Sequence, residues 1–185
     1  MTKRTFIGIK VQLNEELREV FNDLKRELVD ERIKWVSPQN LHVTLHFLGE
    51  TTEEQLVKVL DLIGNKTSGF SGFTMKLNGL SFFRRQSSPS AVFFNLTEVG
   101  ELVELAKSIK LGLSKLGFFV GQKFKPHLTL GRIKYLRDRS AFYDLMEDFA
   151  ETGSQFVKVE SIILYESILK PEGPVYKPVK VFPLS

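Results

Sequence analysis

Cysteine is absent from the 185 residues of this chain. Its absence excludes disulfide bonds, thiolate nucleophiles, cysteine-ligated zinc and iron–sulfur clusters. Long apolar runs are also absent, and none approaches the length of a transmembrane helix. The short apolar run after Met1–Arg4 has neither the length nor the cleavage site of a signal peptide. We therefore expect a cytoplasmic protein that makes no use of a membrane.

Histidine is scarce, and two of the three histidines lie in the same short pattern. His42-Val43-Thr44-Leu45 and His127-Leu128-Thr129-Leu130 both read His, apolar residue, Thr, Leu. The remaining composition, 42% apolar and 26% charged, is typical of a globular domain that buries a sizeable core. The net charge of +4 favours a polyanionic partner, either RNA or a phosphorylated small molecule.

The two patterns lie 85 residues apart, and the same offset aligns other features of the chain. It places Glu16-Leu17 on Glu101-Leu102, at the expected start of a helix in each half. The order strand, helix, histidine strand, helix, strand is expected twice. We infer an internal duplication with repeat units at about 5–86 and 91–170. Such units are expected to form two intertwined lobes related by a pseudo-twofold axis through a central cleft.

We expect one α+β domain, residues 1–185, in which each lobe is an antiparallel sheet with helices on its outside. Helices are predicted after a cap at Asn14 and after a capping-box pattern at Thr51-Thr52-Glu53-Glu54, the second ending at Gly64, and over 102–116 and 142–149. The predicted strands are 5–11, 41–48, 73–83, 91–96, 124–133, 156–169 and 175–182, with a loop at 87–90.

The histidine and threonine of each pattern are two residues apart, so on a strand they lie on the same face, because side chains alternate between the two faces. His42, Thr44 and His46 share one face, and His127 and Thr129 share the corresponding face of the second strand. The apolar residues between them face the core. Each lobe thus offers a histidine and a threonine on a polar face, and a pseudo-twofold axis would bring the two faces together across one cleft.

Two imidazoles and two hydroxyls in one cleft suit chemistry at a phosphoester. In an in-line displacement, one imidazole takes a proton from the nucleophile and the other protonates the leaving oxygen. Imidazole fits both roles because its ordinary pKa is about 6.5. Threonine hydroxyls can donate hydrogen bonds to the non-bridging oxygens and stabilise their charge. The residues alone do not assign acid and base.

The paired patterns resemble the two H-x-T-x motifs of the 2H phosphoesterase superfamily. Their surroundings are similar to the bacterial and archaeal LigT/ThpR branch, in Trp35–Leu41, Phe47-Leu48-Gly49, Phe124-Lys125-Pro126, Gly131-Arg132 and the Pro183-Leu184 ending. A single H-x-T-x motif would carry little weight, but the pair in this context is specific. The resemblance covers essentially the whole chain.

This resemblance implies an RNA 2′,3′-cyclic phosphodiesterase that opens a terminal cyclic phosphate with water and leaves a 2′-phosphate, with 2′-5′ RNA ligation as the reverse reaction. It implies His42 as the proton donor to the 3′ oxygen and His127 as the base that activates water. Thr44 and Thr129 would bind the phosphate. No metal or other cofactor is expected. The expected partners are RNA with a 2′,3′-cyclic phosphate end, such as a tRNA half, or a nucleotide, and the expected state is a monomer.

Three basic residues are candidate substrate contacts. Lys125 has the strand parity of His127, whereas Arg132 has the opposite parity in a regular strand. Arg84 follows two phenylalanines at a strand end, where aromatic and basic residues can stack a base and hold a backbone. We expect His46 to be structural or peripheral and leave it out of the catalytic set. Two other functions stay open: a phosphodiesterase for other nucleotide cyclic phosphates or 2′-5′ linkages, and a non-catalytic module that binds RNA ends.

Overall fold

The computed structural model of the chain describes residues 1–119, 121 and 123–185. Its strands form one antiparallel sheet in the order β7-β4-β5-β6-β3-β1-β8-β9, with β2 paired to β6. The strands are β1 (Thr2–Lys10), β2 (Arg32–Trp35), β3 (His42–Thr52), β4 (Phe73–Arg85), β5 (Ser88–Thr97), β6 (His127–Tyr135), β7 (Ser154–Val159), β8 (Ser161–Lys170) and β9 (Gly173–Pro183). The helices are α1 (Glu15–Glu27), α2 (Glu53–Thr67), α3 (Gly100–Lys115), α4 (Arg139–Asp148) and a short 3-10 turn at Pro38–Asn40.

The sheet order has the symmetry of a duplicated chain. The 85-residue offset places β1 on β5, α1 on α3, β3 on β6, α2 on α4 and β4 on β8. Exchanging these strands turns the order β4-β5-β6-β3-β1-β8 into its own reverse. The predicted α+β fold of two related lobes is therefore confirmed. The two expected sheets are the halves of one continuous sheet, and they meet between β3 and β6.

The two halves of the chain are intertwined within this sheet. β4, from the first half of the sequence, pairs with β5 and β7 from the second half. β8, from the second half, pairs with β1 from the first. Each lobe therefore takes strands from both repeats, and neither repeat completes a lobe by itself.

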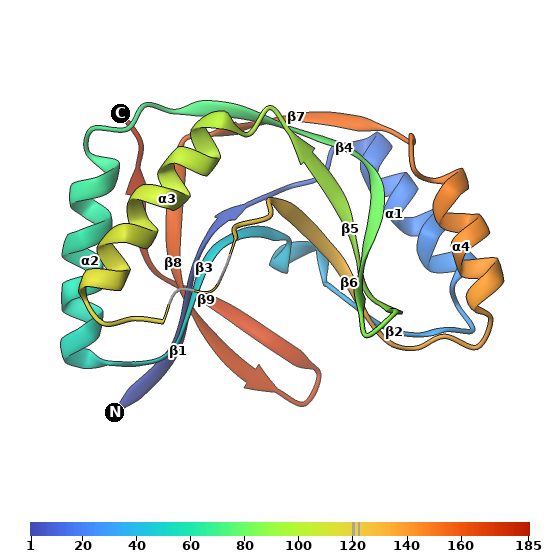
Figure 1. Cartoon of the computed structure of the whole chain (residues 1–185), viewed down its shortest axis with the longest axis horizontal. Helices are drawn as coiled ribbons and strands as arrows, with labels where there is room; N and C mark the ends of the chain where they lie inside the picture. The colour runs from blue at the N-terminus through green and yellow to red at the C-terminus, as the bar shows by residue number, and fades with distance from the viewer. Residues whose placement is uncertain (120, 122) are drawn as a thin grey trace.

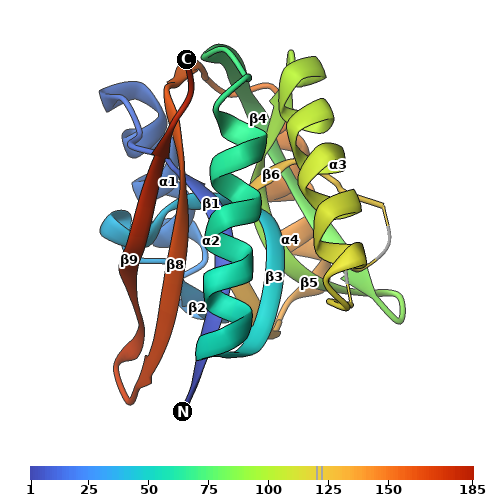
Figure 2. The same cartoon turned by 90° about the vertical axis from the view of Figure 1, so that its left-hand side faces the viewer.

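Helix pairs occupy the two ends of the molecule, with the strands between them (Figure 1). α2 and α3 lie side by side and pack against β3, with α2 also against β9 (Figure 2). At the other end, α1 contacts β7 and α4 contacts β4. One apolar core cluster joins both helix pairs to the sheet. None of the helices in the described part of the chain is long and apolar enough to cross a membrane.

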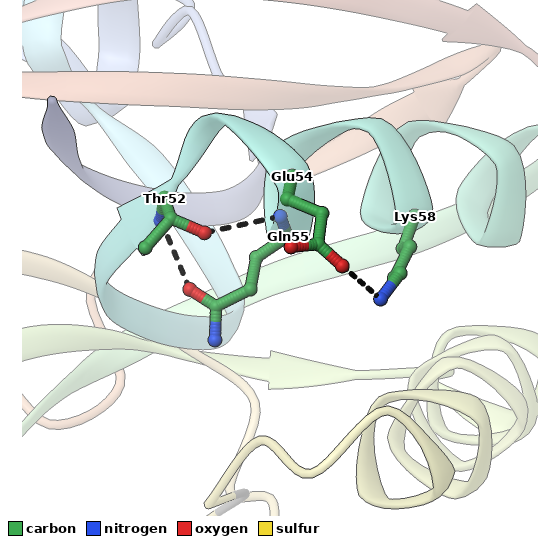
Figure 3. Close-up of polar contacts among 4 residues, drawn as sticks. All are labelled: Thr52, Glu54, Gln55 and Lys58. Carbon is green, nitrogen blue, oxygen red and sulfur yellow. Dashed lines mark hydrogen bonds and ion pairs between the residues drawn. The ribbon is translucent and has the colours of Figure 1, made fainter.

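Local capping explains where the first two helices begin. The Asn14 side chain accepts a hydrogen bond from the backbone N–H of Leu17, as the sequence predicts for a cap. Thr52 and Gln55 form a reciprocal capping box, and Lys58 pairs with Glu54 one turn later (Figure 3). The predicted cap at Asn14 is confirmed. The capping box expected at Thr51–Glu54 is present with Thr52 as the cap and Gln55 as its partner.

Three boundaries predicted from the sequence are wrong. α2 continues past Gly64 to Thr67, because Thr67 extends the buried face of the helix. The segment 87–90 is not a loop, since a two-residue turn at Gln86-Ser87, with φ of 48° and 65°, leads directly into β5. The segment 156–169 is two strands, β7 and β8, that lie in different parts of the sheet. The short strand β2 was not predicted.

Gly79 is the backbone position where the fold leaves least room. Its φ is +66°, and a Cβ there would lie 1.9 Å from the carbonyl oxygen of Ala150. Gly117 has a similar φ of +83° with no atom within 4 Å of a Cβ. It therefore serves as a matched control, because it carries the cost of the left-handed backbone without the clash.

We expect Gly79→Ala to lower the free energy of unfolding by about 3 kcal/mol or more, and Gly117→Ala by roughly 1–2 kcal/mol. Urea denaturation followed by circular dichroism measures both. Equal losses in the two variants would contradict a close approach of Ala150 to Gly79.

Candidate active site

Where the two halves of the sheet meet, β3 pairs with β6 through Val43 and Leu128. These are the residues between histidine and threonine in the two sequence patterns. Neighbouring residues on antiparallel strands lie about 5 Å apart. Continuing this register sets His42 beside Thr129 and Thr44 beside His127. The pairing thus brings the two patterns face to face.

A cavity of about 480 Å³ opens at this seam, and both histidines and both threonines line it. The two histidines and two threonines predicted from the sequence therefore lie together, on one face of the sheet. Other side chains around the cavity come from β1, β3, β6, β8 and β9; those that matter below are Arg4, Phe6, Phe47, Arg132 and Tyr176.

Both histidine strands carry the same irregularity. The register of β3 against β1 skips Leu45, and the register of β6 against β5 skips Leu130, the equivalent residue. The burial patterns of the two strands match over their first six residues, with two consecutive buried positions at the bulge. The side chains after each bulge are therefore turned to the opposite face from the one that strict alternation predicts.

The bulges decide which residues reach the cavity. A regular strand would turn Arg132 away from the site, but the bulge returns it to the cavity wall. The equivalent residue in the other lobe is Phe47, which also lines the cavity and is 58% exposed. The same bulge turns His46 away from the cavity. His46 is buried and donates from Nε2 to the carbonyl oxygen of Ala106 at 2.7 Å. His46 is structural, as the sequence analysis expected.

Backbone carbonyls fix the tautomer of both cavity histidines. His42 Nδ1 lies 2.6 Å from the carbonyl oxygen of Asn40, and His127 Nδ1 lies 2.7 Å from that of Lys125. A carbonyl oxygen only accepts hydrogen bonds, so each Nδ1 carries the hydrogen. Each Nε2 is therefore the atom available for proton transfer, as a base when neutral and as an acid when protonated.

Aromatic rings hold the imidazoles from the sides. The ring of His42 lies 4.8 Å from Phe6 and 5.0 Å from Tyr176, centroid to centroid. The ring of His127 lies 4.7 Å from Phe83 and 5.3 Å from Phe93. These contacts were not predicted, because the residues lie on strands whose sequence pattern shows only that they are strands.

Gly8 makes room for the His42 arrangement. It pairs with Thr44 and occupies the position equivalent to Phe93 of the other lobe. A Cβ at Gly8 would lie 3.0 Å from the carbonyl oxygen of Val43 and 3.4 Å from Cδ2 of His42. A larger side chain there would displace the imidazole, so the aromatic partner of His42 comes from Phe6 instead.

The charge around the cavity is positive. Arg4 and Arg132 line it together with the histidines, and its described lining includes no aspartate or glutamate. Burial lowers the pKa of His42 and His127, and Arg132 lowers both pKa values further because it repels the imidazolium. His127 also lowers the pKa of His42. A cavity with this lining suits an anion that compensates the cations.

Two of the residues predicted to contact the substrate, Lys125 and Arg84, lie outside this cavity. The side chain of Lys125 is exposed and does not line the cavity, although its backbone carbonyl holds His127. Arg84 lies 5.3 Å over the ring of Phe82 and 5.4 Å over that of Tyr143, at a separate pocket between β4 and α4. Of the three basic candidates, only Arg132 shares the cavity with the histidines.

Comparison with known proteins gives one consistent set of matches. The model of the family described as LigT like phosphoesterase matches residues 7–94 and 97–176. A protein of Archaeoglobus fulgidus named RNA 2′,3′-cyclic phosphodiesterase is 36% identical, over 97% of this chain and 99% of its own. A protein of Thermotoga maritima with the same name is 34% identical, over 94% of this chain and 91% of its own.

Solved structures of similar proteins share the fold of this chain over nearly its whole length. A crystal structure of a Thermus thermophilus protein, TT0787, superposes with a TM-score of 0.77 at 30% identity, covering 98% of this chain and 97% of its own. The crystal structure of Escherichia coli LigT complexed with 3′-AMP superposes with a TM-score of 0.79 at 25% identity, covering 100% of this chain and 99% of its own.

Burial of the two cavity histidines, together with the positive charge of Arg132, predicts the direction in which their pKa values shift. We expect His42 and His127 to titrate below the ordinary value of about 6.5, and Arg132→Gln to raise both pKa values because it removes a cation that opposes protonation. NMR titration of the imidazole Cε1 protons measures these pKa values. The pKa of His46, which is lowered by burial and by Lys110, serves as the internal control. Unchanged values for His42 and His127 in the variant would contradict the position of Arg132.

Proposed function

This chain belongs to the LigT-like phosphoesterase family, and we propose that it is an RNA 2′,3′-cyclic phosphodiesterase. It hydrolyses a terminal 2′,3′-cyclic phosphate and leaves a 2′-phosphate. The observation that carries the proposal is the geometry of the cleft. Two histidines line one cavity, each with Nδ1 bonded to a backbone carbonyl so that Nε2 is the ring nitrogen left for proton transfer, and no carboxylate among the described residues lines that cavity.

Proton transfer is divided between the two lobes. Neutral His127 takes a proton from water through Nε2 as the water oxygen forms its bond to phosphorus. Protonated His42 gives its Nε2 proton to the 3′ oxygen as the bond between that oxygen and phosphorus breaks. The carbonyls of Asn40 and Lys125 support both steps, since they accept from Nδ1 and favour the imidazolium. A proton exchange with solvent then resets the pair.

The cyclic phosphate supplies the negative charge that the lining of the cleft lacks. Burial, and then repulsion by Arg132, lower the pKa of both histidines in the free protein. The anion of the substrate favours the imidazolium and offsets this lowering, so one histidine can hold a proton in the complex. Thr44 and Thr129, one from each lobe, donate hydrogen bonds to the non-bridging oxygens. Arg132 stabilises the charge that grows on these oxygens as the bond to water forms.

The substrate is an RNA end, in keeping with the name shared by the curated relatives. A tRNA half with a 2′,3′-cyclic phosphate is one such RNA, and a free nucleotide cyclic phosphate carries the same reacting group. We propose that the protein acts as a monomer, and the origin of both cleft motifs in one chain supports this. Ligation is the reverse direction, with a 5′-hydroxyl in the place of water.

We expect His42→Ala and His127→Ala each to lower kcat by about 10²–10⁴ on a short RNA ending in a 2′,3′-cyclic phosphate, because each removes one proton transfer. The assay contains EDTA, and chromatography identifies the product. A 3′-phosphate product would overturn the assignment of the leaving oxygen. Tight binding of the RNA end without turnover would instead show a binding module.

The threonines are tested separately. Thr44→Val and Thr129→Val are expected to lower kcat/KM about a hundredfold, since each loses a donor to the phosphate oxygens while keeping the shape of the side chain. Thr→Ser at either position keeps the hydroxyl and is expected to retain most activity. Thr74→Val, on an exposed position of β4, is the matched control. Wild-type kinetics in both valine variants would contradict phosphate binding by the threonines.

A further inference from the structure

The hairpin formed by β8 and β9 projects beyond the rest of the sheet (Figure 1). β8 pairs with β1 only as far as Glu166, and from there to its turn the hairpin pairs only with itself in the described part of the chain. Its residues nevertheless line the cleft, through Leu169 and Pro174 near the turn and Tyr176 on β9. An isolated two-stranded hairpin is only marginally stable, so this one needs another anchor to hold its residues at the cleft.

Asn40 supplies such an anchor. Its side-chain Nδ2 donates to the carbonyl oxygen of Pro174 at 2.8 Å. A carbonyl oxygen only accepts, so the amide must present its nitrogen to the hairpin. The backbone N–H of Asn40 donates to the carbonyl oxygen of Ser37 at 2.8 Å, within the 3-10 turn at Pro38–Asn40. One side chain thus joins the turn before β3 to the tip of the hairpin.

The backbone carbonyl of Asn40 holds the imidazole of His42. Its oxygen accepts from Nδ1 of His42 at 2.6 Å. Tyr176, two residues after Pro174 on the same strand, also contacts this imidazole, with ring centroids 5.0 Å apart and an interplanar angle of 86°. The hairpin therefore reaches His42 by two routes, directly through the ring of Tyr176 and indirectly through Asn40.

The duplication supplies a matched position in the other lobe. The 85-residue offset places Lys125 on Asn40, and the carbonyl oxygen of Lys125 accepts from Nδ1 of His127 in the same way. The side chain of Lys125 is exposed and makes no hydrogen bond or ion pair within the described part of the chain. The backbone contact is thus common to both histidines, whereas the side-chain contact to a hairpin is made at Asn40 and not at Lys125.

We propose that Asn40 is a positioning residue, which ties the Nδ1 acceptor of His42 to the β8–β9 hairpin and so keeps Nε2 of His42 directed at the leaving oxygen. The inference rests on the proposed function, in which His42 gives its Nε2 proton to the 3′ oxygen. Proton transfer needs the donor within hydrogen-bond reach of that oxygen. A carbonyl that is free to move fixes neither the tautomer nor the orientation of the ring. The hairpin that lines the cleft therefore also sets the catalytic acid.

The same hydrogen bond bears on the protonation of His42. Burial lowers the pKa of His42, and the hydrogen bond to the Asn40 carbonyl raises it. A weakened bond therefore lowers the pKa of His42 further. The other titratable and charged groups around His42 are Lys10 on β1, His127 and Arg132 on β6, Tyr165 on β8 and Tyr176 on β9. None of them changes when the side chain of Asn40 is removed.

The first experiment measures kinetics on a short RNA ending in a 2′,3′-cyclic phosphate. Asn40→Ala removes the contact to the hairpin and leaves the backbone carbonyl in the chain. We expect kcat to fall about five- to tenfold, the effect of one lost hydrogen bond, with little change in KM. A higher KM at unchanged kcat would overturn the proposal, because it would make Asn40 a substrate contact instead.

The second experiment follows the two imidazoles by NMR, in long-range proton–nitrogen spectra over a pH titration. In Asn40→Ala we expect His42 to gain a population with the hydrogen on Nε2 and to titrate at lower pH than in the wild type. His127 is expected to keep its tautomer and its pKa, which also shows that the variant is folded. Lys125→Ala is the matched control, and we expect it to leave the signals of both histidines unchanged. Unchanged His42 signals in Asn40→Ala would overturn the positioning role.

The third experiment tests whether Asn40 acts through the hairpin. A shortened protein lacks Leu169–Pro174 and joins Ile168 to Val175 through Asn-Gly, which suits a two-residue turn. It keeps Asn40 but has no Pro174 carbonyl for the side chain to bind. We expect Asn40→Ala to cause no further loss of kcat in this shortened protein. A second loss of about five- to tenfold would overturn the coupling to the hairpin.

These outcomes separate the two proposals. If the wild-type protein does not hydrolyse the RNA end, the proposed function fails, while the spectra still test whether Asn40 holds His42. If the wild-type protein hydrolyses the RNA, and Asn40→Ala matches it in kcat and in the His42 signals, the function stands and the positioning role of Asn40 fails.

Discussion

The site depends on one contact between strands, the antiparallel pair of Val43 and Leu128. This pair joins two halves of the sheet that are otherwise built in the same way. Because each residue stands between a histidine and a threonine, the contact sets the separation of the four polar side chains that line the cleft. No loop intervenes, so the geometry of the cleft has the precision of a β-ladder. The apolar residues of the motifs are thus as much a part of the site as the polar ones.

Duplication made the two histidines alike, and later divergence made them different. Both receive the same support from a carbonyl two residues earlier in the chain. Their neighbours differ, because the bulges bring Phe47 to one side of the cavity and Arg132 to the other. One lobe thus offers an aromatic surface and the other a cation. Under the proposed function this difference matters, because a symmetric cleft could not distinguish the two ester oxygens of a cyclic phosphate, whereas unlike surroundings can.

Most of the fold was predictable because the signals are local or repeated. The cap at Asn14, the capping-box pattern at Thr51-Thr52-Glu53-Glu54, the helical periodicity and the 85-residue offset all lie in the sequence itself. What could not be predicted depends on pairing between distant strands. A bulge is invisible in a single strand, so Arg132 was expected on the wrong face. Tyr176 lies on β9, which follows the second repeat, so its contact with His42 had no counterpart from which to infer it. Arg84 stacks on Tyr143 of α4, a contact between distant segments that the sequence does not show.

The exchange of β4 and β8 between lobes also bears on how the chain acquires its structure. When the first half leaves the ribosome, β1 has β3 to pair with but lacks β8, and β4 lacks both of its neighbours. The sheet can close only after the last quarter of the chain has been made. Folding is therefore dominated by contacts of long sequence separation, which slow the search. In an ancestor with a single repeat, the strand equivalent to β4 and β8 would have paired with a second copy of the chain. The present chain thus corresponds to such a strand-swapped dimer with its two copies joined into one polypeptide.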